Sequence, residues 1–167
     1  MLGPMPSEIS INSLMMADEQ TLRDIAILEI VAWDRTPRPG EVKVRKQLLE
    51  RELEQSDPDT KRVLVAKKSE VIIGIGRVER TSDDPGAWMV FGLAVHPDYR
   101  RQGIGRALVH ASVGFARSRG ARTVRSETHA DNRASIAFHE SVGFAHGRCF
   151  TAPDGDEILA FSMVLAD

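Results

Sequence analysis

Residues 91–108 read Phe91-Gly-Leu-Ala-Val-His-Pro-Asp-Tyr-Arg-Arg-Gln-Gly-Ile-Gly-Arg-Ala-Leu108. The apolar run from Trp88 to Val95 is short and contains aromatic and β-branched residues, so it favours a strand. After the turn, apolar residues recur with a period of about 3.6 residues, which predicts a helix whose N-terminus lies at Gly103. The sequence therefore predicts a strand, a turn rich in arginine and glycine, and a helix, in that order.

The turn has the properties of an anion-binding site. Gly103 and Gly105 let the backbone approach a ligand closely. The first amides of the following helix have no intrahelical partner, so they can point at phosphate oxygens. Arg100 and Arg101 add positive charge at the same place. We interpret the turn as a pyrophosphate cradle.

Two other nucleotide-binding motifs do not fit this sequence. Gly103-Ile-Gly105 continues into Arg-Ala-Leu108, without the third glycine of a dinucleotide fingerprint, and no Gly-Lys-Ser/Thr sequence follows as in a P-loop. A second pair, Gly74-Ile-Gly76, lies in a strand-like alternation with no helix behind it. We interpret that pair as structural.

Two motifs of this chain resemble the GNAT superfamily of N-acyltransferases. The pattern Arg100-x-x-Gly103-x-Gly105, after a strand that ends in Val95-His96-Pro97, is similar to the acyl-CoA-binding motif of that superfamily. Downstream, Asn132-Arg-Ala-Ser-Ile-Ala-Phe-His139-Glu-Ser-Val-Gly143-Phe144 resembles its Asn…Tyr…Gly-Phe segment, with His139 where tyrosine is most common. The resemblance covers residues 63–144 well, and it implies an α+β fold with a mixed, mostly antiparallel twisted sheet flanked by helices.

The resemblance also implies acetyl-CoA as the acyl donor. The strand holding Leu93 to Val95 would bind the pantetheine arm through its backbone, and one of its amides would polarise the thioester carbonyl. Asn132 would hold the pantetheine or an ordered water, and His139 would stand beside the sulfur. The residues expected to contact the cofactor are Leu93, Ala94, Val95, Arg100, Arg101, Gln102, Gly103, Ile104, Gly105, Arg106, Asn132, Ser135 and His139.

The predicted helix after Asn132 has a polar and an apolar face. Asn132, Ser135 and His139 share one face by helical spacing, and we expect that face to look into the cofactor cleft. Ala134, Ala137 and Phe138 are apolar and are expected to pack into the core. Asn132 has an alternative role as a simple helix cap.

Acetylation of an amine by a thioester requires a base that removes a proton from the amine, but no covalent nucleophile from the enzyme. A thioester is already activated, whereas an amine arrives mostly as ammonium and must lose a proton before it attacks. Glu127 is the candidate base, because the segment from Ser126-Glu127 to Gly143-Phe144 resembles one branch of aminoglycoside 6'-N-acetyltransferases. Alternatively, Glu127 binds a cationic amine without acting as a base, or it is an exposed residue at the end of a strand with no functional role. His139 is either the acid that protonates the leaving thiolate or a spacer.

Composition limits the class of protein. A chain of 167 residues with 42% hydrophobic content is expected to form one domain, residues 1–167. The net charge of -2 argues against nucleic-acid binding, and no histidine spacing predicts a metal site. The single cysteine, the absence of a leader pattern in residues 1–7 and the absence of a membrane-spanning apolar run favour a cytoplasmic protein.

Periodicity predicts the other elements. We expect a strand around Ile9 to Ile11 and a helix capped by Asp18 that runs to about Trp33. A further helix is expected over residues 41–54, and strands over residues 62–67, 70–79, 122–127, 145–150 and 157–165. The loops 33–40, 82–86 and 151–156 are expected to set acceptor specificity.

These observations favour an N-acetyltransferase that moves an acetyl group directly from acetyl-CoA to a primary amine of a small molecule. An aminoglycoside or an amino-acid-like amine is the leading acceptor. The alternatives are a protein or peptide lysine acetyltransferase and a non-catalytic acyl-CoA sensor, and a homodimer is left open.

Overall fold

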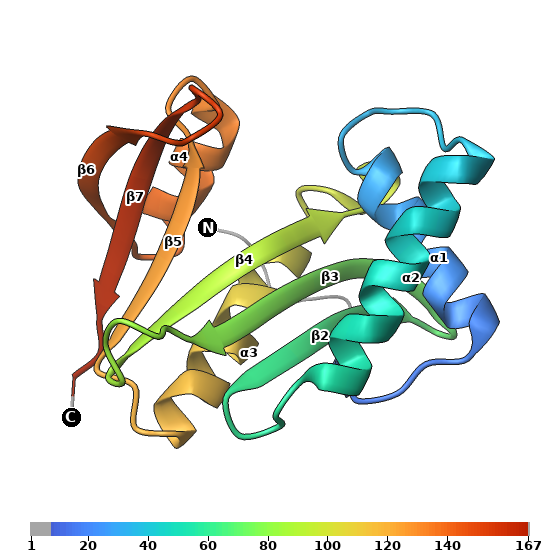
Figure 1. Ribbon diagram of the computed structural model, residues 1–167, viewed down its shortest axis with the longest axis horizontal. Coiled ribbons are helices and arrows are strands. Elements are labelled where there is room, and N and C mark those ends of the chain that lie inside the picture. Colours follow the sequence, from blue (N-terminus) through green and yellow to red (C-terminus); the bar gives the residue numbers. More distant parts are fainter. Residues whose placement is uncertain (1–7, 167) are drawn as a thin grey trace.

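A computed structural model describes residues 8–166 of the chain, in which seven strands form one sheet with the order β1-β2-β3-β4-β5-β7-β6 (Figure 1). Every pair of neighbours is antiparallel except β4 and β5. The strands are β1 (Ile9–Leu14), β2 (Lys61–Lys68), β3 (Val71–Arg80), β4 (Ala87–Val95), β5 (Thr123–His129), β6 (Ala145–Thr151) and β7 (Glu157–Val164). The predicted mixed, mostly antiparallel sheet is therefore confirmed.

The helices cover both faces of this sheet. They are α1 (Glu19–Val31), α2 (Pro39–Gln55), α3 (Ile104–Ser118) and α4 (Arg133–Ser141), with a short 3-10 helix at Pro97–Tyr99. Figure 1 shows α1 and α2 on one face of β2, β3 and β4, and α3 on the other. Alternate residues of β2 pack on the two faces of the sheet, whereas a bulge in β3 at Ile73 places Ile73 and Ile75 on opposite faces. Val63, Val65 and Ile75 pack with α1 and α2, whereas Leu64, Ala66 and Ile73 pack with α3.

Local signals in the sequence predicted the starts of α1 and α2 to within two residues. Asp18 is the N-cap of α1, and its Oδ1 accepts a hydrogen bond from the Thr21 amide at 2.7 Å. Helix α2 begins at Pro39, two residues before the predicted start. Proline is favoured at the first helical position because its φ is already helical. It also lacks an N–H, and the N–H at this position would have no intrahelical partner in any residue.

Gly74 has the structural role that we predicted for it. A Cβ atom at Gly74 would lie 3.1 Å from side-chain carbons of both Ile104 and Leu108. Helix α3 can therefore lie directly on β3 because this position has no side chain.

Strand β4 leaves its parallel neighbour early. Among the described residues, β4 pairs with β5 along Ala87–Met89, and the two ribbons then diverge (Figure 1). On its other edge, β4 carries a bulge, since Gly92 and Leu93 together lie opposite the single residue Gly76 of β3. Gly92 has φ +59°, a conformation that glycine adopts with little strain.

Substitution of Gly92 tests the bulge. A Cβ at Gly92 would lie 2.7 Å from Arg77 Nη1, in addition to the left-handed backbone. We expect Gly92→Ala to lower the free energy of unfolding by about 1–3 kcal/mol. The matched control is Gly114→Ala in α3, where nothing lies within 4 Å and alanine should raise stability by about 0.5–1 kcal/mol. Urea denaturation measures both, and equal effects would contradict the bulge assignment.

Candidate functional site

Two cavities meet at the point where β4 leaves β5. The first, which we name the α3 cavity, has a volume of about 580 Å³. The second, the β4–β5 cavity, has a volume of about 260 Å³. Leu93 of β4 and Phe138 of α4 line both of them. The two side chains thus lie at the junction between the cavities.

The α3 cavity brings together most of the predicted cofactor residues. It is lined by Leu93, Val95, Tyr99, Arg100, Arg101, Gly103, Ile104, Gly105, Arg106, Ala134, Ala137, Phe138 and Ser141. Gly103 is the N-cap of α3, with φ +82° and no side-chain capping bond. The first-turn amides of α3 are therefore directed at the cavity without a competing side-chain acceptor, which suits an anion.

The three arginines of this cavity have different contacts. Arg106 Nη2 donates to the Ser141 carbonyl at 2.8 Å, so it ties α3 to the end of α4. Arg100 donates to the Ala32 carbonyl and lies 3.5 Å from Asp34, which directs it toward the end of α1. Arg101 is exposed and adopts φ +63°. Of the three, Arg101 is best placed to offer its charge to a ligand.

The β4–β5 cavity is lined by residues of strands β4 and β5 and of helices α1, α2, α3 and α4. Its lining residues are Glu29, Trp33, Arg45, Val90, Gly92, Leu93, Ala94, Val109, Ser126, Glu127, Thr128, Ser135, Phe138, His139 and Phe144. Glu127 lies on β5, which continues past the predicted end to His129, and its side chain is exposed to the cavity. The cavity thus combines an accessible carboxylate with the bulged part of β4.

His139 is buried at the wall of the β4–β5 cavity. Its ring stacks on Phe161, with the ring centroids 4.5 Å apart. The Ser135 carbonyl can only accept a hydrogen bond, so His139 Nδ1, 2.7 Å away, carries a proton and donates to it. In a neutral ring, Nε2 then has no proton and can only accept from the Ser126 hydroxyl, 2.8 Å away, whose single proton can alternatively be donated to the Val90 carbonyl at 3.0 Å. Both ring nitrogens are thus engaged.

Burial controls the charge of His139. Removal from water disfavours the cationic ring and lowers the pKa of His139 below 6.5, although the bond to Ser135 opposes this effect. The ring is therefore mostly neutral at pH 7. The bond from Nδ1–H to Ser135 lies within α4, and the contact between Nε2 and Ser126 joins α4 to β5.

Helix α4 is oriented differently from our expectation. Ala134 and Ala137 are exposed and line the α3 cavity, so the prediction that they pack into the core is wrong. Phe138 does pack against the core, and it also lines both cavities. The helical spacing of apolar residues does not distinguish a core-facing side from a side that lines a ligand groove, because such a groove also needs apolar walls and small residues. His139 instead enters the protein interior, where Phe161 and Ser126 accommodate it.

Two predicted cofactor residues do not line either cavity. Asn132 is the N-cap of α4, and its Oδ1 accepts from the Ser135 amide at 3.0 Å, as in the alternative role considered above. Gln102 points back to the Asp98 carbonyl at 3.4 Å. Ala94, Ser135 and His139 line the β4–β5 cavity rather than the α3 cavity.

The predicted specificity loops are only partly at the site. Trp33 lines the β4–β5 cavity, but within residues 8–166 neither cavity is lined by residues 82–86 or 151–156. Loop 82–86 precedes β4, and Asp83 pairs with Arg125 at 2.8 Å. Parallel strands β4 and β5 start at the same end, so this loop lies at the end opposite to the cavities.

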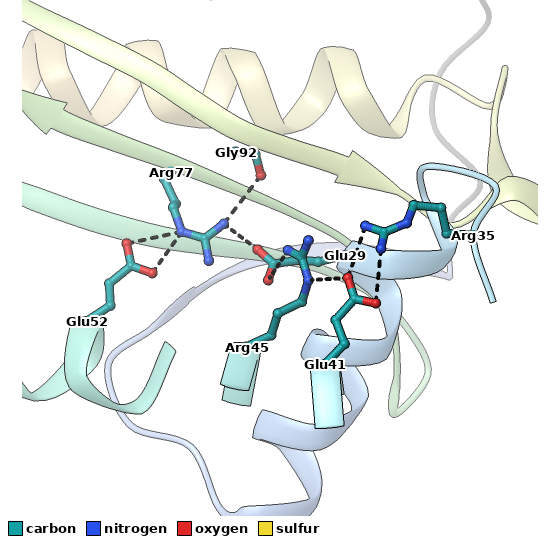
Figure 2. A network of polar contacts seen from close by, with 7 residues as sticks. All are labelled: Glu29, Arg35, Glu41, Arg45, Glu52, Arg77 and Gly92. Carbon is teal, nitrogen blue, oxygen red and sulfur yellow. Dashed lines mark hydrogen bonds and ion pairs between the residues drawn. The ribbon is translucent and has the colours of Figure 1, made fainter. Parts of the chain in front are cut away.

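An ion network that the sequence did not reveal lies beside the β4 bulge (Figure 2). Arg77 is 8% exposed, and its Nε donates to both oxygens of Glu52 at 3.0 and 2.8 Å, while its Nη1 lies 2.7 Å from Glu29. It also donates to the Gly92 carbonyl at 3.5 Å. Burial disfavours the charged guanidinium, but the two carboxylates outweigh it and raise the pKa of Arg77.

Glu29 and Arg45 extend this network into the β4–β5 cavity. They lie on α1 and α2, far in sequence from the glycine turn. Their helical spacing carried no functional signal, because charged residues on amphipathic helices are usually solvated. Only the packing of α1 and α2 on the sheet brings them to the site.

No group of three histidine, cysteine or acidic side chains in residues 8–166 could hold a metal ion. No helix in that part of the chain is long and apolar enough to cross a membrane.

The protein is an α+β protein with two adjoining cavities beside β4. The family model described as "Acetyltransferase (GNAT) family" matches residues 27–144, which is more than half of the chain. The chain belongs to this acetyltransferase family.

Known proteins match the chain over short segments or at low identity. It is 47% identical to ribosomal protein bS18-alanine N-acetyltransferase of Escherichia coli over 55 residues, 33% of this chain and 37% of that protein. It is 45% identical to aminoglycoside N(6')-acetyltransferase type 1 of Klebsiella aerogenes over 65 residues, 37% of this chain and 43% of that protein. The structure of PaiA N-acetyltransferase from Thermoplasma acidophilum with coenzyme A has a TM-score of 0.70 at 18% identity, covering 91% of this chain and 97% of that one. At this identity, the structure shows a shared fold.

The buried histidine predicts a pH dependence of stability. Because the pKa of His139 is lower in the folded chain than the ordinary 6.5, its neutral form stabilises the fold above pH 6.5, and this contribution is lost as the pH falls through the folded pKa. We expect the free energy of unfolding to fall more steeply below pH 6.5 in the unsubstituted protein than in His139→Gln. The slopes should differ by up to about 1.4 kcal/mol per pH unit. Denaturant titrations between pH 5 and 7.5 measure this, and parallel curves would show that His139 titrates normally.

Proposed function

We propose that this chain is an acyl-CoA-dependent N-acetyltransferase that moves an acetyl group directly from acetyl-CoA to a primary amine of a small molecule. The observation that carries the proposal is the meeting of two cavities at Leu93 and Phe138. One cavity contains an uncapped helix N-terminus with cationic neighbours. The other contains the exposed carboxylate of Glu127. Donor and acceptor would therefore meet at the divergence of β4 and β5.

The α3 cavity fits the donor. Amides of the first turn of α3 would bind the pyrophosphate, because Gly103 has no side chain that caps them. The apolar and small residues Ala134 and Ala137 form a wall along which a pantetheine arm can lie. Among the described residues, the backbone pairing of β4 with β5 ends at Met89, and the Val90 carbonyl then accepts a hydrogen bond from the Ser126 side chain. The polar groups of β4 beyond Val90 can therefore bind the arm and the thioester carbonyl.

The reaction needs one base. Acetyl-CoA supplies an activated thioester. The amine nitrogen bonds to the acetyl carbon, the carbon–sulfur bond breaks, and the thiolate leaves with its electron pair. Glu127 would accept the proton that the amine loses, directly or through an ordered water. Its position in the β4–β5 cavity supports this role.

His139 has two possible roles, and the geometry favours one of them. Its mostly neutral ring and its contact with Ser126 of β5 support a positioning role, in which it holds α4, and Phe138 with it, against β5. Protonation of the departing thiolate would need a cationic ring. The thiolate is a good leaving group without such help.

The names of the relatives are consistent with an amine acceptor. One is named as an acetyltransferase for an alanine of ribosomal protein bS18, and the other for the 6' nitrogen of an aminoglycoside. Both matches cover less than half of those proteins, so we take from them the amine as the acceptor group and not the acceptor molecule.

Gly103→Glu tests the pyrophosphate cradle. A carboxylate at this position would repel phosphate, and a side chain would strain the backbone at φ +82°. We expect the affinity for acetyl-CoA, measured by calorimetry, to fall by more than about tenfold. Gly114→Glu places the same side chain in open space on the same helix and should keep the affinity of the unsubstituted protein. Unchanged binding by Gly103→Glu would refute the cradle.

Glu127→Gln tests the base. We expect kcat/KM to fall by about tenfold or more, together with loss of the acidic limb of the pH–rate profile. Release of CoA thiol with amino acids, aminoglycosides, polyamines and lysine peptides measures this in a Cys149→Ser background, because Cys149 is exposed and would react with the thiol reagent.

A charge-matched control accompanies this test. Glu70→Gln removes an exposed carboxylate from the turn between β2 and β3 and should leave the rate unchanged. A normal rate and pH profile for Glu127→Gln would exclude it as the base. If no amine caused release of CoA thiol while acetyl-CoA still raised the Tm, the result would favour the non-catalytic sensor.

A further inference from the structure

Three charged side chains line the β4–β5 cavity, Glu29, Arg45 and Glu127, and Glu29 is held in a 2.7 Å ion pair with Arg77. The groups left for a ligand are the carboxylate of Glu127 on β5 and the guanidinium of Arg45 on α2. The two residues approach β4 from different sides, since β5 neighbours it in the sheet and α2 packs on the face (Figure 1). The cavity therefore presents opposite charges from two of its walls.

Arg45 is weakly paired within the protein. Its Nη1 lies 3.9 Å from Glu29, and its Nε lies 3.5 Å from Glu41 (Figure 2). Neither contact involves Nη2. Nε is buried and has no hydrogen-bond partner among the described residues, although 32% of the side chain is exposed. These contacts leave a guanidinium whose donors are largely unused.

The two carboxylates near Arg45 have closer partners. Glu29 Oε1 is 2.7 Å from Arg77 Nη1, and the Glu29 side chain is 15% exposed. Glu41 is 3.0 Å from Arg35. Since both acids are paired more tightly elsewhere, neither neutralises Arg45 through a short contact. A ligand anion can therefore compete for its donors.

We propose that the acceptor of this chain carries a carboxylate beside its primary amine, and that Arg45 binds that carboxylate. The inference rests on the proposed acetyltransferase function. A guanidinium is planar and matches a carboxylate with two parallel hydrogen bonds. The amine of the same molecule would then lie toward Glu127, where its proton is removed. Arg45 is in this sense a specificity-determining residue.

Size and charge disfavour the other acceptor classes. A cavity of about 260 Å³ is smaller than the ~300–1,000 Å³ that encloses a drug-sized ligand, so it suits a small amino acid better than a multi-ring aminoglycoside. Polyamines and aminoglycosides carry further ammonium groups, which Arg45 would repel. A free amino acid, or a short peptide that ends within the cavity, satisfies both charges.

The experiment compares L-amino acids with their carboxamides, in which the carboxylate is replaced by a neutral group. We expect the unsubstituted protein to prefer the acids by more than about tenfold in kcat/KM, mainly through KM. Arg45→Met keeps a long apolar stem and should abolish this preference. Arg45→Lys should retain part of it, because an ammonium keeps the charge but loses the planar fork.

Two controls accompany these variants. Lys43→Met makes the same charge change at an exposed position of the same helix and should leave the preference intact. The affinity of Arg45→Met for acetyl-CoA should stay within about twofold of the unsubstituted value, because Arg45 does not line the α3 cavity.

The outcomes separate this inference from the proposed function. Equal rates with acids and carboxamides, or faster transfer to polyamines or aminoglycosides, would overturn the role of Arg45 and leave the acetyltransferase standing. An acid preference that survives in Arg45→Met would also overturn it. Release of no CoA with any amine would overturn the acetyltransferase itself, and the inference with it.

Discussion

The parallel pairing of β4 with β5 ends at Met89, and the functional geometry depends on this separation. If the two strands stayed paired, their backbone groups would satisfy one another and no cavity would form between them. The bulge at Gly92 bends β4 at the point of separation. Arg77 lies against that bulge, and two carboxylates hold its guanidinium, so a buried ion network supports the shape of the strand. Charged groups are costly to bury without a partner, so an arrangement of α1, α2 or β4 that separated Arg77 from these carboxylates would leave a buried charge unpaired.

The separation also divides the chemistry between two surfaces. On one side, the N-terminus of α3 and its arginines give a positive end to a largely apolar groove. On the other side, β5 and the two N-terminal helices enclose a smaller and more polar space. Phe138 lies at the junction, and Gly105 allows its close approach, because a Cβ there would lie 3.2 Å from the Phe138 ring. The glycine that favours anion binding therefore also permits the packing of α4 that forms the junction.

Much of the fold and half of the site could be predicted from local patterns. The turn between β4 and α3 and the cap at Asp18 follow from short-range rules. The cap at Asn132 was one of two roles considered for that residue, and the mostly antiparallel sheet was implied by the family resemblance. The orientation of α4 did not follow from such rules, since apolar residues at helical spacing look the same whether they face a core or a ligand groove. The charged residues of α1 and α2 were also missed. Glu29 and Arg45 are close in space to β5 only because both helices pack on one face of the sheet.

The sequence by itself determined the family-specific part of this protein, the glycine and arginine turn at the start of α3 and the Asn132–Phe144 segment, because backbone conformation and helix termini depend on neighbouring residues. It also determined that Glu127 ends up near a strand end. The tertiary structure alone decided where β4 separates from β5, that His139 is buried and mostly neutral, and that Arg45 reaches the cavity. The charge state of His139 arises from its burial. The cavity brings together Arg45 and Glu127, which are more than 80 residues apart in the sequence. No local sequence pattern encodes burial or such long-range proximity.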